Sequence, residues 1–148
     1  MNLLHLEARF SSMQPMILGF DPGRDKCGIA VMGLDRKLYC HQVISALDAI
    51  AAIEKLRQQF PISLIVIGNQ TTAKNWKQKV EVELSEPPSI VMVDERYTTL
   101  EARDRYWQMY PPQGIQQLLP RGLRQPPKPI DDIVAILLIE RYLNRLAQ

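Results

Sequence analysis

The chain has 148 residues, of which 46% are hydrophobic and 23% are charged, and its formal net charge is +2. This length suits one ordinary domain with a buried core. Because the chain shows neither a signal-peptide pattern nor an apolar run of about 18 residues, we expect a cytoplasmic protein without a membrane partner. Two cysteines are too few for a disulfide framework. The small net charge does not by itself indicate nucleic-acid binding.

The first half of the chain predicts an antiparallel meander. Residues 1–15 precede the first strong pattern and are expected to form a loose N-terminal extension to one domain over residues 16–148. Apolar runs of strand length then follow, bounded by turn residues. The predicted strands are 16–20, 28–34 and 37–45, with a turn at Asp35-Arg36.

The second half alternates helices with strands. The predicted order is a helix at 46–59, a strand at 62–67, a helix at 73–84, a strand at 90–93, and helices at 98–110 and 130–146. The continuous apolar run of 62–67 is typical of a strand that is covered on both faces. Thr98 and Glu101 have the spacing of a capping box, and Asp131 or Asp132 is well suited to cap the last helix. Residues 111–129 hold six of the eleven prolines and form a long loop.

Carboxylates stand at the ends of three buried elements. Asp21 follows the first strand, Asp94-Glu95 follows the last strand, and Asp131-Asp132 opens the last helix. In open α/β sheets, ligands bind beyond the carboxyl ends of the strands. Grouped carboxylates repel one another unless a cation compensates their charge. Because no cysteine or histidine has zinc-site spacing, an oxygen-liganded ion such as Mg²⁺ or Mn²⁺ fits best.

Each of these features also has a purely structural interpretation. Asp21 with Pro22-Gly23 could form only a tight turn. Residues 94–96 could form a solvated turn with a local ion pair. The basic residues Arg121, Arg124 and Lys128 could belong to a solvated loop, although they lie just before Asp131 in the sequence, where a phosphate backbone could pass.

Three segments resemble the motifs of the YqgF/RuvX family, whose members have an RNase H-like fold and are related to the Holliday-junction resolvase RuvC. The segments are LGFDPGRDKCGIAV, VDERYTTLEA and IDDIVAILLIERYL, and the resemblance covers residues 16–146. It implies an α/β, RNase H-like fold with the element order β-β-β-α-β-α-β-α. The five-stranded mixed sheet would have the order 3-2-1-4-5 and be flanked by helices.

The resemblance implies a metal-dependent endonuclease that hydrolyses phosphodiester bonds in structured nucleic acid, in maturation of the small-subunit (16S) rRNA precursor. The alternatives are a Holliday-junction-type resolvase acting on branched DNA, or a catalytically weak nucleic-acid-binding module. Asp21, Glu95 and Asp131 would be the catalytic residues and the ligands of Mg²⁺ or Mn²⁺, with Asp94 and Asp132 in contention. The implied nucleic-acid contacts are Gly23, Lys26, Arg96, Arg121, Arg124 and Lys128; Lys26 stands where the family usually has arginine.

One segment departs from the family pattern. Many members have Gly-Leu-Pro after the central strand, whereas this chain has Gly68-Asn69-Gln70-Thr71-Thr72, closer to the YqgF-like domain of the transcription accessory protein Tex. Asn69 offers a neutral amide oxygen, a poorer ligand for a dication than a carboxylate. In the implied sheet, the strand before Glu95 lies about 9–10 Å from the first strand. The turn at 94–98 must therefore curl back across the intervening strand if Glu95 is to approach Asp21.

Two further interpretations concern packing and a competing fold. Trp76 and Trp107 lie at helical spacing, which favours packing over base stacking. An ATPase of the actin and sugar-kinase type also ends its first strand in an aspartate beside glycine. Such proteins close two domains on a nucleotide, so the length of this chain argues against that class, as does the absence of a Walker sequence.

Overall fold

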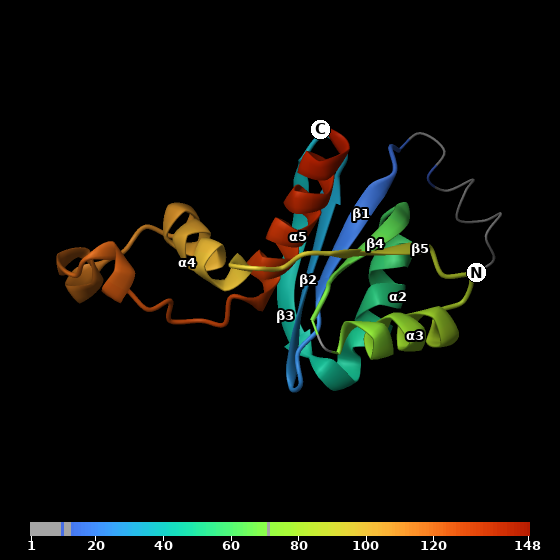
Figure 1. Cartoon of the computed structure of the whole chain (residues 1–148), viewed down its shortest axis with the longest axis horizontal. Helices are drawn as coiled ribbons and strands as arrows, with labels where there is room; N and C mark the ends of the chain where they lie inside the picture. Colours follow the sequence, from blue (N-terminus) through green and yellow to red (C-terminus); the bar gives the residue numbers. More distant parts are fainter. Residues whose placement is uncertain (1–9, 11–12, 71) are drawn as a thin grey trace.

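The computed structural model describes residues 10, 13–70 and 72–148, and these form a mixed five-stranded sheet in the order β3-β2-β1-β4-β5 with helices on both faces (Figure 1). The strands are β1 (Met16–Asp21), β2 (Lys26–Gly33), β3 (Leu38–Ser45), β4 (Ile62–Gly68) and β5 (Ser89–Val93). The helices are α2 (Ala49–Gln59), α3 (Ala73–Glu83), α4 (Thr98–Met109) and α5 (Asp131–Leu146), with short 3-10 turns η1 (Ala46–Asp48), η2 (Gly114–Leu118) and η3 (Arg121–Leu123). The predicted fold class, element order and strand order are confirmed. None of the helices in the described part of the chain is long and apolar enough to cross a membrane.

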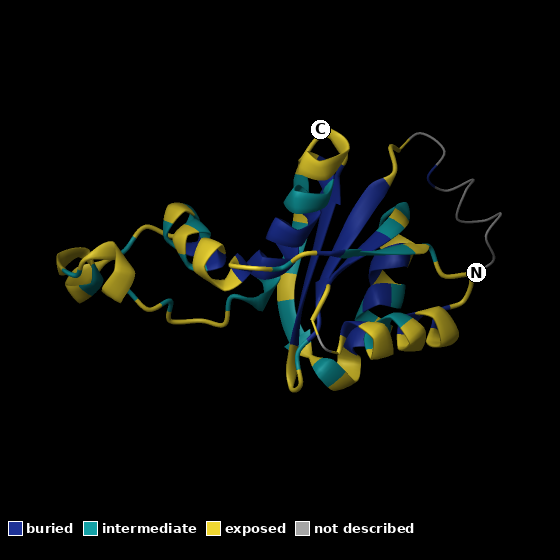
Figure 2. Cartoon of the chain, in the orientation of Figure 1, coloured by how far each residue is buried: buried dark blue, intermediate teal, exposed yellow. Residues whose placement is uncertain are grey.

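Strand β1 is the centre of the sheet, and all six of its residues are buried. It pairs antiparallel with β2 and parallel with β4. Its side chains alternate between two apolar clusters, as a strand requires. Ile17 belongs to the cluster under α4 and α5, whereas Leu18 and Phe20 belong to the cluster under α2 and α3. This alternation builds three layers, with the sheet in the middle (Figure 2).

Helix α5 packs closely on the sheet because two glycines leave room for its backbone. Every residue from Ile133 to Ile139 is buried. A Cβ atom at Gly19 would collide with the carbonyl oxygen of Ala135, and one at Gly28 would collide with the carbonyl oxygen of Asp131. The first turn of α5 is therefore held directly against β2.

Both tryptophans are used in packing, as predicted. The Trp76 ring meets Phe20 edge-on with ring centroids 5.2 Å apart, and the Trp107 ring meets Tyr106 in the same way at 5.0 Å. Trp107 also packs against the cluster beneath α5. Such edge-to-face aromatic contacts stabilise the packing beyond the area that they bury.

The segment 111–129 and helix α4 project from one side of the sheet (Figure 1). The segment is mostly exposed (Figure 2), and its two 3-10 turns give it more regular structure than the predicted loop. The Arg124 Nε atom donates hydrogen bonds to the carbonyl oxygens of Gln116 and Leu119, at 2.9 and 3.1 Å. These bonds draw the segment back on itself.

The predicted helix caps are wrong. Thr98 is the first residue of α4, and its hydroxyl donates to the carbonyl oxygen of Glu95 at 2.7 Å. Tyr97, at φ 65°, occupies the N-cap position instead, because the chain enters the helix through a left-handed residue. Asp131 and Asp132 lie inside the first turn of α5, with Ile130 at the N-cap position and no side-chain cap. Their charges still lie at the positive end of the helix dipole.

Other differences from the predicted elements are small. The helix predicted at 46–59 begins as η1 and becomes α-helical only at Ala49. Strand β2 starts at Lys26, two residues earlier than predicted. The predicted extension at residues 1–15 falls mostly outside the described residues, so it and the domain boundary stay predictions.

Candidate active site at the carboxyl end of the central strands

Asp21 ends β1 and is 7% exposed, although it carries a carboxylate. It pairs with Gly28 of β2. On the other side of β1, Phe20 pairs with Ile67 of β4, and Gly68 is the next residue of that strand. Asp21 thus belongs to the strand, while the tight turn follows it. A Cβ atom at Gly23 would collide with the carbonyl oxygen of Lys26, so the turn itself requires glycine there. The interpretation of Asp21 as only a turn residue does not explain its burial.

The side chain of Glu95 reaches back across β4 toward Asp21. We expected the turn at 94–98 to curl back in this way. A Cβ atom at Gly68 would lie against the Glu95 carboxylate, so the glycine leaves the space that this side chain enters. Arg141 of α5 holds the turn in place, since its guanidinium donates to the carbonyl oxygens of Asp94 at 2.7 Å and Arg96 at 2.6 Å. Nothing in the sequence pattern pointed to Arg141, because its partners are more than 40 residues away.

Gln70 connects the two carboxylates. Its Nε2 atom donates to Asp21 Oδ1 at 3.3 Å and to Glu95 Oε2 at 2.6 Å. The two acidic side chains therefore lie within two hydrogen-bond lengths of each other. Asn69, which we expected to contribute an amide oxygen here, instead accepts the backbone N–H of Glu95 at 3.4 Å. The amide beside the carboxylates belongs to the next residue along the chain.

Asp131 is the third acidic residue near Asp21. Its backbone contacts Gly28, the residue that pairs directly with Asp21 across the β1–β2 ladder. Its charge is also close enough to raise the pKa of Asp21. The end of β1, the turn after β5 and the start of α5 therefore bring Asp21, Glu95 and Asp131 to one end of the sheet.

The electrostatics of this cluster disfavour its full ionisation. Burial, together with the nearby charges of Asp131 and Glu95, raises the pKa of Asp21 to about 7. Burial also raises the pKa of Glu95, as does Asp94, while the Arg141 guanidinium partly opposes that shift. A cation would relieve this repulsion, and the oxygen donors suit a hard divalent ion. As arranged, however, no three acidic, histidine or cysteine side chains among the described residues are close enough to hold an ion together.

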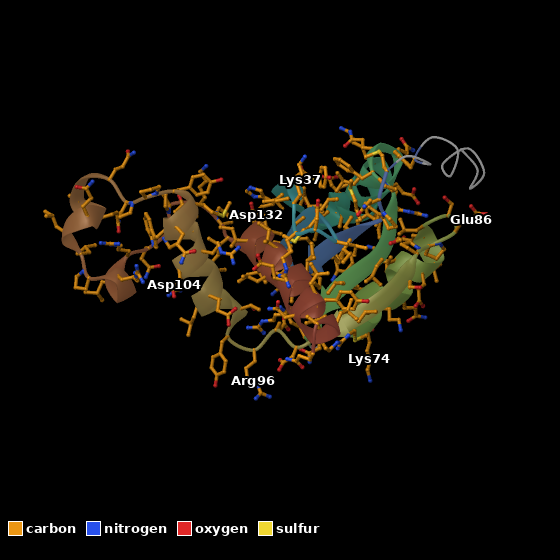
Figure 3. All side chains as sticks on the ribbon, turned by 90° about the horizontal axis from the view of Figure 1, so that it is seen from above. Lys37, Lys74, Glu86, Arg96, Asp104 and Asp132 are labelled. Atoms are coloured by element: carbon orange, nitrogen blue, oxygen red, sulfur yellow. The ribbon has the colours of Figure 1, made fainter. Side chains whose placement is uncertain are left out.

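Asp94 and Asp132, the two alternative candidates for metal ligands, have other hydrogen-bond partners. Asp94 is exposed, and its Oδ1 accepts the backbone N–H of Arg96 at 2.9 Å. Asp132 Oδ2 lies 2.6 Å from His41 Nδ1 of β3, and its Oδ1 accepts the backbone N–H of Ile133. Figure 3 shows Asp132 at the start of α5, well away from Arg96. His41, to which no sequence pattern assigns a role, fastens this end of α5 to β3.

The predicted phosphate-binding side chains come from three separate segments of the chain. Lys26 begins β2 and Arg96 lies in the turn after β5, and both are exposed. Arg121 is also exposed, whereas Arg124 is tied to the backbone of its own segment. The Lys128 ammonium lies 5.5 Å from the centre of the Tyr110 ring. A role for these residues in binding nucleic acid stays a prediction.

Comparisons with known proteins identify relatives of this chain. Two curated relatives, from the RSA 331 and RSA 493 strains of Coxiella burnetii, are each 26% identical over 142 residues, covering 86% of this chain and 91% of their own. Both carry the name "Putative pre-16S rRNA nuclease".

Solved structures of RuvC from Thermus thermophilus share the fold. The structure bound to a Holliday-junction substrate has a TM-score of 0.52 at 15% identity and covers 90% of this chain and 96% of its own. A second RuvC structure has a TM-score of 0.54 at 15% identity, covering 89% and 96%. A family model described as "RuvX: Holliday junction resolvase" matches residues 15–145. This match spans the sheet, all three acidic elements and nearly all of α5, and the chain therefore belongs to the RuvX (YqgF) family, with an RNase H-like fold.

Proposed function

We propose that this protein is a metal-dependent endonuclease that hydrolyses phosphodiester bonds in the precursor of the small-subunit rRNA. The observation that carries this proposal is the convergence of Asp21, Glu95 and Asp131 from three separate elements around a buried carboxyl group. The names of the relatives support the choice of an rRNA precursor as the substrate.

In this proposal, Asp21, Glu95 and Asp131 hold Mg²⁺ or Mn²⁺. A divalent cation supplies positive charge at the phosphate and makes a neighbouring water more acidic. The protein contributes the positions of its carboxylates. Asp21 is fixed by the β1 ladder, Asp131 by the contact of its backbone with Gly28, and Glu95 by the Arg141 bonds to its turn.

The basic residues would orient the substrate. Lys26 and Arg96 are exposed on segments adjoining the strand ends that carry Asp21 and Glu95. Arg121, Arg124 and Lys128 lie on the segment that leads into α5 and Asp131. Contacts from such side chains to phosphates fix the register of a nucleic acid without reading its sequence. We therefore expect recognition of RNA structure rather than of one sequence.

The experiment that tests this proposal is cleavage of a labelled pre-16S rRNA fragment with Mg²⁺ or Mn²⁺. The Asp21→Asn variant should lose cleavage by about a thousandfold or more while still binding the RNA, because binding depends on the basic residues. Asp104→Asn is the matched control, since Asp104 is exposed on α4. Equal cleavage by wild type and Asp21→Asn would overturn the proposed site.

A binding module without cleavage is the second candidate. The favouring observation is the Gln70 amide between Asp21 and Glu95, together with the lack of a ready three-ligand group among the described residues. RNA binding without cleavage under either metal would assign this function. A four-way DNA junction belongs in the same assay, because cleavage of the junction but not of the RNA would assign the resolvase alternative.

A further inference from the structure

Gln70 lies at the point where a cation shared by Asp21 and Glu95 would have to sit. One nitrogen, Nε2, contacts a carboxylate oxygen of each residue, at 3.3 and 2.6 Å. The glutamine is exposed and lies two residues beyond the end of β4, so its side chain can turn without disturbing the core.

The orientation of this amide is fixed by its neighbours. A glutamine amide has an NH₂ group that only donates and an oxygen that only accepts. Both neighbours here are carboxylates, which accept hydrogen bonds when ionised. Turning the oxygen inward would place it against two other oxygens. The NH₂ group therefore faces the carboxylates as long as no cation is bound.

A cation would reverse that preference. Mg²⁺ binds carboxylate oxygens at about 2.0–2.1 Å. An ion that close to Glu95 Oε2 would meet the NH₂ group, which already lies 2.6 Å from the same oxygen. Repulsion between the ion and the amide hydrogens would expel the NH₂ group, whereas the amide oxygen would be attracted.

We infer that Gln70 is a reversible substitute for the cation: its NH₂ group bridges Asp21 and Glu95 in the metal-free protein, and its amide turns to present Oε1 to the ion on binding. This inference rests on the proposed function, since it requires Asp21 and Glu95 to be metal ligands. It makes Gln70 a positioning residue that holds the carboxylates together before the ion arrives and adds a neutral oxygen ligand afterwards.

The proposal predicts opposite effects for two substitutions. Gln70→Ala removes the neutral ligand and the bridge, so the dissociation constant for Mn²⁺ should rise about three- to tenfold. Gln70→Glu adds a charged ligand, so the same constant should fall about tenfold, because affinity for hard cations rises with the number of charged ligands. Gln70→Glu should also lower the melting temperature of the metal-free protein, since a third carboxylate replaces the amide donor.

Isothermal titration of the full chain with Mn²⁺ alone measures these constants without any need for activity. Gln78→Ala and Gln78→Glu are the matched controls, because Gln78 is exposed on α3, and neither should change Mn²⁺ affinity. In ¹⁵N-labelled protein, Mg²⁺ should shift the side-chain NH₂ resonances of Gln70 and leave those of Gln78 in place.

Each failure has a distinct meaning. If Gln70→Ala binds Mn²⁺ as tightly as wild type or more tightly, Gln70 merely obstructs the site, and the inference is overturned while the proposed function stands. Unchanged affinity in Gln70→Glu, or an unshifted Gln70 resonance, overturns it equally. If wild type binds no Mn²⁺ at all, the inference and the metal-dependent function are both overturned.

Discussion

Among the described residues, two charged side chains are buried, one at each end of the sheet, and their surroundings differ. At one end, Arg57 of α2 is 9% exposed and donates to the carbonyl oxygens of Ser85 at 2.9 Å and Glu86 at 2.7 Å. At the other end, Asp21 is 7% exposed and accepts a hydrogen bond of 3.3 Å from Gln70. The two charges that act on its pKa, those of Asp131 and Glu95, have the same sign as its own.

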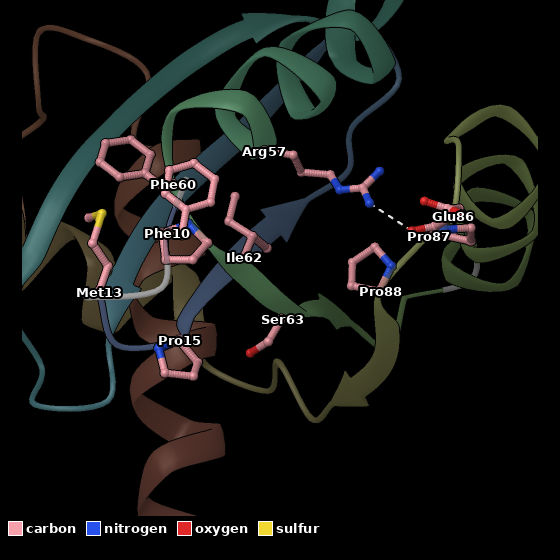
Figure 4. A pocket seen from close by; sticks show the side chains of 11 residues that line it. Phe10, Met13, Pro15, Arg57, Phe60, Ile62, Ser63, Glu86, Pro87 and Pro88 are labelled. Atoms are coloured by element: carbon pink, nitrogen blue, oxygen red, sulfur yellow. Dashed lines mark hydrogen bonds between the residues drawn. The ribbon is translucent and has the colours of Figure 1, made fainter. Parts of the chain in front are cut away.

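The surroundings of Arg57 are those of a structural residue. A cavity of about 680 Å³ lies beside it, lined mostly by apolar residues such as Phe60, Ile62 and Pro88 (Figure 4). The guanidinium reaches toward the loop before β5, which also lines this cavity, and its hydrogen bonds join α2 to that loop. Because a buried charge that loses its partners is strongly destabilising, these hydrogen bonds give Arg57 a structural role.

The comparison therefore separates a buried charge that has hydrogen-bond partners in the fold from one that lies among charges of the same sign. A buried charge without compensation destabilises the protein that contains it, and active sites are where such groups gather. If this interpretation is correct, removal of the charge should destabilise the protein at Arg57 and stabilise it at Asp21.

The largest expected effect is on the pH dependence of stability. The pKa of Asp21 rises from 3.8 in the unfolded chain to about 7 in the fold. A raised pKa gives stability that is present below pH 4 and is lost as the pH rises through about 7, by up to roughly 4 kcal/mol. Metal-free Asp21→Asn should therefore unfold at higher urea concentration than wild type at pH 8, and the two should converge at pH 4. A less stable variant at pH 8 would refute the comparison.

The next effect is the converse change at Arg57. Arg57→Met keeps much of the side-chain length but removes the donors to Ser85 and Glu86, so the free energy of unfolding should fall by about 3 kcal/mol. Urea unfolding at pH 7 measures this loss. Lys55→Met is a suitable control because Lys55 is exposed on the same helix. No difference between the two variants would mean that Arg57 has no structural role.

A smaller effect is expected at Arg141 of α5, which holds the turn that carries Glu95. Arg141→Met removes its bonds to the turn around Glu95 and to Glu101, and it should cost about 1–2 kcal/mol of stability. Affinity for Mn²⁺ should fall as well, since Glu95 loses the support of its turn. Arg145→Met, on an exposed residue of the same helix, should change neither quantity.

The smallest effect is expected for the acidic partner of Arg57. Glu54 lies 3.4 Å from the guanidinium and is 32% exposed. Glu54→Gln should lower the free energy of unfolding by less than about 1 kcal/mol, because exposed ion pairs contribute little and the carbonyl bonds to Arg57 remain. A loss as large as that of Arg57→Met would show that the ion pair, rather than the carbonyls, compensates the buried charge.

The sequence was sufficient for the strands because local patterns specify them, whereas the strand order in the sheet followed from the resemblance to the YqgF/RuvX family. The apolar runs predict all five strands, and the position of Asp21 at the end of β1 follows directly from them. The turn of Glu95 across β4 could also be predicted, because the strand spacing demands it if Glu95 is to approach Asp21.

What escaped prediction depends on contacts between distant residues or on single backbone angles. The predicted capping box at Thr98 does not form, because Tyr97 adopts a left-handed conformation that no local sequence pattern indicates. Gln70 and Asn69 are adjacent amides, and only the path of the chain after β4 decides which one meets the carboxylates. Arg141 and His41 act through partners that lie far away in the sequence.

The glycines around Asp21 have a consequence for how this site can vary. Gly28 and Gly68 lie on the strands that flank Asp21, and a methyl group on either would push against Asp131 or Glu95. A saturation-mutagenesis library selected for function should therefore show a band of intolerance that runs across three strands, through positions far apart in the chain. At Gly28 and Gly68, the two outer positions of this band, selection would keep glycine because a larger side chain has no room, not because a chemical group is needed.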